Sequence, residues 1–284
     1  MSLPNPTDRA YVLVTGAAAG IGAELARQLA GRGHQLLLVD RQADRVDLLA
    51  AELSECHRVE VAARACDLTV KRQRDALIAQ VRRDPRALVG LCNNAGIFSL
   101  GRFHELPLER ELEMVQVNVV AVHHLTGALL PGMVARGEGA ILNTASLAAN
   151  QPLPELATYA ATKAFVHSFS ESLHAELAGT GVSCTSLQPN ATTTDIAINA
   201  GLERESAVLP SFVWASAESV ARAGIDGMVN GRRAVVPGVA NRILVSPLGR
   251  YLPRAIGLPV VRAAISSGLR RSRRPTTPAS PPER

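Results

Sequence analysis

Short runs of apolar, often branched residues alternate along this chain with longer stretches in which apolar residues recur every three to four positions. Seven runs have the length and composition of buried β-strands, at 11–15, 36–39, 59–65, 88–92, 140–144, 182–187 and 234–236. The stretches between them predict helices near 21–29, 48–53, 70–83, 109–130, 159–177 and 216–229. Strands that alternate with helices need crossover connections, so the pattern predicts an α/β protein with a doubly wound parallel sheet of about seven strands and helices on both faces. Ligands bind such sheets at the carboxyl ends of the strands.

The alternation ends after Pro237, and the composition changes. Three prolines interrupt residues 242–269, which mix Ile, Leu and Val with spaced arginines. Residues 270–284 read RRSRRPTTPASPPER, a composition that cannot build a core and is predicted to be disordered. We therefore divide the chain into a folded domain at 1–241, an apolar and basic C-terminal extension at 242–269, and a tail at 270–284.

Composition and charge narrow the class of protein. Hydrophobic residues make up 47% of the 284 residues, which is enough for a sizeable core and too much for a disordered chain. The net charge of +5 equals the charge of residues 262–284, where six arginines outweigh one glutamate, so residues 1–261 sum to zero. A nucleic-acid-binding domain carries its excess charge on its folded body, so we expect no nucleic-acid partner.

The sequence also bears on location in the cell. Its four cysteines are widely spaced, as is typical of reduced thiols, and its first residues lack the apolar core of a secretory signal. No run of 18 apolar residues occurs, so we expect no membrane-spanning segment. These features favour a cytoplasmic protein. Its basic extension could still touch an anionic membrane surface at the periphery, or could pack against a neighbouring subunit.

The first predicted strand runs directly into a glycine-rich turn, because residues 15–22 read TGAAAGIG. Glycine lets another group approach the backbone closely, and free amides at a helix start can bind a pyrophosphate. Taken alone, the segment could equally be an ordinary glycine-rich loop. Its spacing, TGxxxGIG, resembles that of the short-chain dehydrogenase/reductase (SDR) family, whose members have the Rossmann fold. The resemblance covers about residues 8–238.

Further motifs of that family follow at the expected intervals. Residues 93–96 read NNAG, a YxxxK motif runs from Tyr159 to Lys163, and Ser146 lies 28 residues after Asn118 and 13 before Tyr159. The resemblance implies that Asn118, Ser146, Tyr159 and Lys163 are catalytic, and that residues 1–241 form a catalytic dinucleotide-binding domain. It also implies a cofactor site made of Gly16, Ala18, Gly20, Ile21, Gly22, Asp40, Arg41, Asp67, Leu68, Asn94, Ala95, Gly96, Tyr159, Lys163, Pro189, Thr192 and Thr194.

The residue types explain how the implied chemistry would work. A free tyrosine has a pKa of about 10 and is a poor base at neutral pH. Lys163 lies one helical turn from Tyr159, so its charge would stabilise the phenolate and make proton exchange workable near pH 7. By resemblance, Tyr159 exchanges a proton with the substrate oxygen and Ser146 hydrogen-bonds that oxygen. Lys163 also holds the nicotinamide ribose, Asn118 supports a water in a proton relay, and Asp67 accepts a hydrogen bond from the adenine amino group.

Each of these residues has a plain structural alternative. Tyr159 and Lys163 could lie on a solvated helix face, Ser146 could cap the end of a strand, and Asn118 could hydrogen-bond within its own helix. Their conjunction favours an oxidoreductase that moves hydride between a nicotinamide cofactor and a carbonyl or secondary alcohol group. The alternative is a non-catalytic NAD(P)-binding regulator or scaffold on the same fold. The seven histidines show no HxxxH or HExxH spacing, so we expect no metal site.

The choice of cofactor depends on the end of the second strand. Asp40 can bind the adenosine ribose hydroxyls and repels a 2′-phosphate, which favours NAD, whereas Arg41 beside it is typical of NADP sites. One position departs from the family. Asn190 stands where the PGxVxT motif has glycine, and because asparagine tolerates left-handed backbone angles, we expect the turn to survive.

The segments that form the substrate pocket in the family are apolar here. They contribute Phe98, Leu147, Leu153, Pro154, Leu156, Ile198, Leu202, Leu209, Phe212 and Trp214. No arginine or lysine occurs between residues 147 and 158, so we expect a lipophilic ketone or secondary alcohol as the small-molecule substrate. The same side chains could instead simply pack a lid. The resemblance also implies a homodimer or homotetramer.

Overall fold

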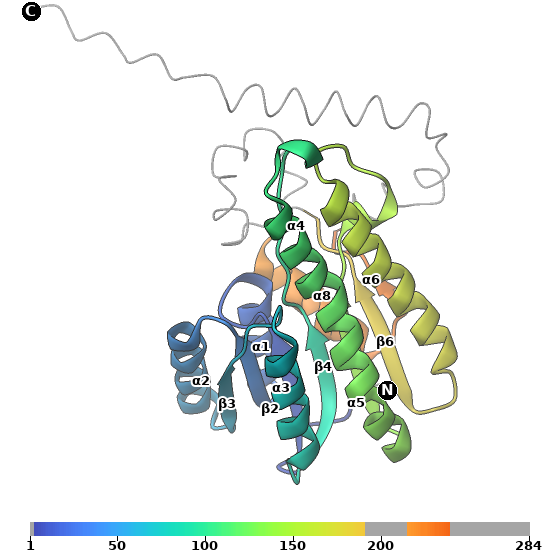
Figure 1. Cartoon of the computed structure of the whole chain (residues 1–284). Coiled ribbons are helices and arrows are strands. Elements are labelled where there is room, and N and C mark those ends of the chain that lie inside the picture. The colour runs from blue at the N-terminus through green and yellow to red at the C-terminus, as the bar shows by residue number, and fades with distance from the viewer. Residues whose placement is uncertain (1–2, 191–214, 239–284) are drawn as a thin grey trace, which may run out of the picture.

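The computed structural model describes residues 3–190 and 215–238 (Figure 1). Its seven strands form one parallel sheet in the order β3-β2-β1-β4-β5-β6-β7. The strands are β1 (Ala10–Thr15), β2 (Gln35–Asp40), β3 (Val61–Ala65), β4 (Ala87–Asn93), β5 (Gly139–Thr144), β6 (Val182–Leu187) and β7 (Ala234–Val235). This confirms the predicted doubly wound parallel sheet and its number of strands.

Helices cover both faces of the sheet and divide its core in two. On one face lie α1 (Gly20–Gly31), α2 (Ala43–His57) and α8 (Ala217–Val229), and on the other lie α3 (Lys71–Arg83), α5 (Val122–Arg136) and α6 (Ala157–Glu176). Side chains alternate between the faces of a strand. Accordingly, Val12 and Val14 of β1 join the first core, whereas Tyr11 and Leu13 join the second.

The strand order reverses between β1 and β4, because the chain winds outward from β1 to β3 and then returns to β4 on the other side. At such a switch point the connections leave the two strands in opposite directions and open a crevice at their carboxyl ends. The glycine-rich turn follows β1 and the NNAG segment begins at the last residue of β4. The fold therefore brings these two motifs to the same edge of the sheet.

One long helical rod runs along the second face. It consists of α4 (Leu108–Val115), a π-helical turn η2 (Gln116–Ala121) and α5. Within the described residues, this rod is long and apolar enough to cross a membrane by length and composition alone. The prediction from runs of 18 apolar residues missed it, because hydropathy averages 1.4 over a window that includes polar residues. Here its buried Leu125, Leu129 and Met133 pack on the sheet, as in the core helix of a globular domain.

Several predicted features lie outside the described residues. They are the cofactor contacts Thr192 and Thr194, the pocket residues 198–214, the extension 242–269 and the tail 270–284. The two short 3₁₀ turns η1 (Phe103–Glu105) and η3 (Leu147–Asn150) lie within the described part, in the connections that follow β4 and β5.

Candidate active site

The glycine-rich turn is packed so closely that its glycines cannot be replaced by larger residues. Gly16 has a left-handed φ of +67°, and a Cβ there would lie 2.7 Å from Ala95 Cα. A Cβ on Gly22 would lie 1.9 Å from the carbonyl oxygen of Gly16. No side chain in the described residues caps the start of α1, and its first turn carries no acidic residue. The amides and the positive end of the helix dipole therefore suit an anionic group, and the turn fits a pyrophosphate.

Asp40 is fixed at the end of β2 by two backbone amides. Its Oδ2 accepts a hydrogen bond from Ala18 N (3.1 Å) in the glycine-rich turn, and its Oδ1 accepts one from Gln42 N (3.0 Å). The carboxylate is thus held against the turn, where a ribose beside the pyrophosphate would lie. Arg41 is exposed to solvent.

The segment after β3, residues 66–70, forms what we call the adenine-side loop. Asp67 Oδ1 accepts hydrogen bonds from Thr69 N (2.9 Å) and Thr69 Oγ1 (2.7 Å), and Asp67 N donates to Gln73 Oε1 (2.7 Å). Leu68 is buried. Cys66 N donates to Asp40 O (2.8 Å), so this loop lies next to the end of β2.

A residue that the sequence analysis passed over joins β1 to the NNAG segment. Thr15 Oγ1 accepts hydrogen bonds from Asn94 N (3.0 Å) and Ala95 N (3.1 Å). In return, Asn94 Nδ2 donates to Thr15 O (3.2 Å) and Gly16 O (3.3 Å). The only signal for this role in the sequence was a hydroxyl at the last position of an otherwise apolar strand.

Lys163 is buried, contrary to the alternative of a solvated helix face. Its side chain lies on α6, is 5% exposed, and donates from Nζ to Thr144 O (2.8 Å) at the end of β5. The same Nζ lies 5.8 Å from the centre of the Tyr159 ring. A Cβ on Gly96 would lie 3.3 Å from Nζ, so the NNAG segment closes over the ammonium group.

Burial acts on the pKa values of Tyr159 and Lys163 in opposite directions. Burial raises the pKa of the Tyr159 phenol, and a hydrogen bond with the Ser146 side chain lowers this pKa by a smaller amount. Burial also lowers the pKa of Lys163 to about 8. Desolvation thus disfavours both charged forms, and the stabilisation of the phenolate by Lys163 during proton exchange stays a prediction.

Ser146 follows β5 and does two things at once. Its hydroxyl caps η3 by accepting a hydrogen bond from Ala148 N (3.2 Å), as the structural alternative proposed. It also acts on the Tyr159 phenol as a hydrogen-bond partner. A hydroxyl oxygen has two lone pairs and one proton, so the cap and the contact with Tyr159 are compatible.

Asn118 makes its contacts outside its own helix. It lies in the π-helical turn η2 and is almost fully buried. Its Oδ1 accepts from Ile97 N (3.0 Å), and its Nδ2 donates to Ile97 O (2.9 Å) and to Thr162 Oγ1 (3.1 Å). The amide thus holds the backbone of the NNAG connection against α6, and π-helical turns are frequent at functional sites.

The chain that follows β6 is described as far as residue 190. Pro189 O accepts a hydrogen bond from Leu147 N (2.9 Å), which joins the ends of β5 and β6. In the described part of the chain, Arg58 and Glu155 are the non-glycine residues with positive φ. Asn190 therefore occupies the glycine position of the family motif without a left-handed backbone. The expected reason for accepting asparagine there, its tolerance of left-handed angles, does not apply.

Residues 97–101, which we call the substrate loop because the SDR resemblance predicts substrate contacts near Phe98, follow the NNAG segment and contact Tyr159. The Phe98 ring meets the Tyr159 ring edge to face at 5.7 Å between centres. Ser99 Oγ donates to the buried carboxylate of Glu111 on α4, and Gly101 N donates to Glu155 O (2.9 Å). Sequence reasoning missed both anchors, because neither belongs to a motif.

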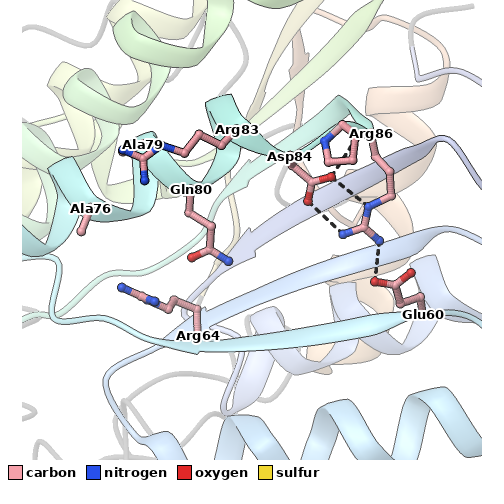
Figure 2. Close-up of a pocket in the computed structure, with 9 residues that line it drawn as sticks. Glu60, Arg64, Ala76, Ala79, Gln80, Arg83, Asp84 and Arg86 are labelled. Atoms are coloured by element: carbon pink, nitrogen blue, oxygen red, sulfur yellow. Dashed lines mark hydrogen bonds and ion pairs between the residues drawn. The ribbon is translucent and has the colours of Figure 1, made fainter.

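A second hollow lies away from this crevice. It has a volume of about 870 Å³ and lies beside α3, between Glu60 and Arg64 on one side and residues 84–86 on the other (Figure 2). Its acidic groups are already paired, because Arg86 bonds to both Glu60 (2.7 Å) and Asp84 (2.9 Å). Glu60 and Arg86 precede β3 and β4, so the hollow is next to the amino ends of these strands rather than at the edge where ligands bind.

Comparison with known proteins gives consistent matches. The family model of short chain dehydrogenases matches residues 10–205. Hydroxysteroid dehydrogenase-like protein 1 of Gallus gallus is 31% identical over 248 residues, which are 87% of this chain and 73% of that protein. Very-long-chain 3-oxoacyl-CoA reductase of Bos taurus is 35% identical over 196 residues, 66% of this chain, and the chain spans 61% of its length.

A solved structure extends the likeness to the whole fold. It is a short-chain dehydrogenase from Sphingobium yanoikuyae in complex with NADPH, with a TM-score of 0.75 and 31% sequence identity. The match covers 95% of this chain and 98% of that one.

Proposed function

Since this chain belongs to the short-chain dehydrogenase family, we propose that its oxidoreductase chemistry is carried by Tyr159, Ser146 and Lys163. Family membership makes it a nicotinamide-dependent oxidoreductase of carbonyl or alcohol groups. The observation that carries the residue roles is the convergence of a buried ammonium and two hydroxyls on one point of the crevice.

A nicotinamide bound in this crevice would supply or accept the hydride. Tyr159 Oη donates a proton to the carbonyl oxygen of the substrate during reduction, and Ser146 Oγ hydrogen-bonds the same oxygen. Lys163, protonated at neutral pH because its pKa is about 8, stabilises the phenolate left behind. Asn118 keeps the backbone at Ile97 in place behind this group.

Burial raises the pKa of the Tyr159 phenol, so the resting group suits the role of proton donor in carbonyl reduction. Oxidation of an alcohol by the same site needs the phenolate as base.

A pair of matched variants tests the role of Tyr159. Tyr159→Phe should keep dinucleotide affinity and lose turnover by at least about 100-fold. Tyr11→Phe is the control, because Tyr11 lies near the amino end of β1, away from the edge where ligands bind, and its buried hydroxyl has no hydrogen-bond partner among the described residues. Equal turnover of the two variants would remove Tyr159 from the mechanism and favour a non-catalytic NAD(P)-binding regulator or scaffold.

For the cofactor we propose NAD in preference to NADP. Ala18 N and Gln42 N hold the Asp40 carboxylate from two sides, so it cannot swing away from a 2′-phosphate. The NADPH in the Sphingobium relative and the neighbouring Arg41 support NADP instead. Binding of NADH and NADPH to wild type and Asp40→Ser decides between them: Asp40→Ser should gain affinity for NADPH, and tighter NADPH binding by the wild type would refute the proposal.

For the substrate we propose a bulky lipophilic ketone or secondary alcohol. The Phe98 ring beside Tyr159 is apolar, and two matched relatives are named hydroxysteroid dehydrogenase-like protein 1 and very-long-chain 3-oxoacyl-CoA reductase. A screen of ketones and alcohols that follows the absorbance of reduced nicotinamide tests this. Turnover confined to small charged carbonyl compounds would contradict it.

The extension invites a proposal from sequence alone. We propose that residues 242–284 make peripheral contact with anionic membranes, while the enzyme remains a cytoplasmic homodimer or homotetramer. Co-sedimentation with phosphatidylserine vesicles should be greater for the full chain than for residues 1–241. Equal sedimentation would refute the membrane contact, and a change in oligomeric state on truncation would assign the extension to subunit packing.

A further inference from the structure

Helix α3 buries Leu77, Ile78 and Val81 in the second core, and one charged residue of the helix is buried as well. Arg74 is only 3% exposed, although its neighbours Arg72, Gln73 and Asp75 are all exposed. Its guanidinium group donates from Nη1 to Leu68 O (2.5 Å) in the adenine-side loop and from Nε to Nδ1 of His124 on α5 (3.4 Å). A charged side chain has therefore been taken out of water in order to bind a loop carbonyl.

No carboxylate in the described part of the chain lies within ion-pair distance of Arg74. The nearest acidic neighbour in sequence, Asp75, pairs with Lys71 (2.8 Å) and faces His124 (3.7 Å). Burying a guanidinium without a counter-charge is costly, and an apolar side chain at this helix position would pack without that cost. The presence of arginine here therefore indicates that the fold needs the N–H donors of the guanidinium group and not only the volume of the side chain.

The atom that Arg74 holds belongs to the loop that borders the predicted cofactor site. Leu68 directly follows Asp67, whose own amide is held by Gln73 of the same helix. The first turns of α3 thus fix the loop on both sides of the Asp67–Leu68 peptide bond, at the N–H of Asp67 and at the carbonyl of Leu68. Cys66 N is bonded to Asp40 O, so this fixed loop is also tied to the end of β2.

His124 completes the arrangement from a different element. Its Nδ1 accepts from Arg74, which requires a neutral ring with its proton on Nε2, facing Asp75. Burial and the charge of Arg74 lower the pKa of His124, while Asp75 opposes that effect and Lys71 and His123 add to it. The guanidinium is therefore held between a loop carbonyl and a neutral ring nitrogen, and its direction is set from two helices.

We propose that Arg74 is a positioning residue for the adenine half of the dinucleotide: by holding Leu68 O, it fixes the Asp67–Leu68 segment in the conformation that binds adenine. The inference rests on the proposed function and on the expectation, implied by the SDR resemblance, that Asp67 binds adenine. It adds a residue that belongs to none of the motifs and touches no part of the cofactor itself.

The test compares two arginines on one helix in the full-length protein. Arg74→Met removes the buried donors and keeps the length of the side chain, and Arg72→Met is the matched control on the exposed face. Calorimetric titration with 5′-AMP and with NADH and NADPH should show about tenfold weaker binding for Arg74→Met and no change for Arg72→Met. With saturating dinucleotide, kcat should stay at the wild-type value, since the nicotinamide end is untouched.

Three other results overturn the inference. If folded Arg74→Met binds 5′-AMP as tightly as Arg72→Met, the arginine has no positioning role. If kcat falls while 5′-AMP affinity is unchanged, its role lies elsewhere. If Arg74→Met does not fold, Arg74→Lys decides by the same criterion. A wild-type protein that binds no dinucleotide would refute the proposed function itself, which separates the two failures.

Discussion

Lys163 and Arg74 are two buried cations on different helices, α6 and α3. Each must find a hydrogen-bond partner away from water, and they differ in what the buried charge can then do. Each donates to a backbone carbonyl near the carboxyl end of a strand, Thr144 O at the end of β5 and Leu68 O after β3. Neither forms an ion pair within the described residues. Lys163 lies beside a tyrosine and its pKa falls to about 8, so it can respond to a proton that moves nearby.

Arginine cannot respond in this way, because its guanidinium stays protonated at any physiological pH. Its planar group with several donors suits a task in which direction matters and titration does not. The comparison teaches that the two residue types are not interchangeable here: the titratable cation lies where charge changes, and the permanent one lies where geometry must be held.

Exchanging the two residue types is the strongest way to break this comparison. Lys163→Arg should reduce kcat by at least about 100-fold, because a guanidinium cannot adjust its charge and is larger than the ammonium that lies close to Gly96. Arg74→Lys keeps a charge and one donor, so it should change cofactor affinity and leave kcat intact. Steady-state kinetics at saturating dinucleotide measure both. A Lys163→Arg variant with near wild-type kcat would show that only a positive charge is needed.

The pH dependence of the free energy of unfolding should also distinguish Lys163 from Arg74. Lys163 has a pKa of about 8 in the folded state and 10.5 as its ordinary value, so between these values the unfolded chain holds more protons. Below pH 8 the buried ammonium therefore lowers the free energy of unfolding by its full amount, and this loss disappears as the pH rises toward 10.5. The loss is at most roughly 3 kcal/mol.

Lys163→Met should accordingly be stabilised relative to wild type at pH 7, and the gain should shrink at pH 9. Denaturant unfolding at the two pH values measures it. Burial raises the pKa of the Cys92 and Cys184 thiols to about 12, which destabilises both proteins at high pH and cancels in the difference. Arg74→Met should show no such trend, and a pH-independent difference for Lys163→Met would contradict the assignment.

The smallest expected effect concerns the exposed neighbour of Arg74. Gln73→Met removes the acceptor of the Asp67 amide and leaves Leu68 O bound to Arg74. Because the side chain is exposed and water can replace it, 5′-AMP affinity should fall only about two- to threefold. Calorimetry alongside Arg74→Met gives the comparison. A larger loss of 5′-AMP affinity for Gln73→Met than for Arg74→Met would show that Gln73, and not Arg74, has the positioning role.

The sequence was sufficient for the features that depend on local spacing. The turn at 15–22, the NNAG segment and the YxxxK helix each lie within one or two adjacent elements, so their order along the chain fixes which edge of the sheet they reach. The alternation of apolar runs was sufficient for all seven strands. The roles of Tyr159, Ser146, Lys163 and Asn118 remain predictions that the variants above test.

Contacts between distant elements were not predictable in this way. Arg74 lies in a segment that reads KRQRD, and only the packing of α3 against α5 shows which of its arginines is buried. The contact of Glu111 with Ser99 depends on the tilt of α4, and the π-helical turn at Asn118 has no signature in the pattern of apolar residues. The pKa of Tyr159 depends on how much water the whole fold excludes, which spacing along the chain does not report.

The rod of residues 108–136 connects these contacts mechanically. Glu111 near its start holds the substrate loop, Asn118 holds Ile97, and His124 further along holds Arg74. A helix of 29 residues behaves as a stiff lever roughly 43 Å long. Laboratory evolution of this rod would therefore change substrate size and cofactor affinity together, although engineers prefer to tune them separately. A substitution that tilts the rod to admit a larger ketone would also move His124 and, through Arg74, the loop proposed to bind adenine.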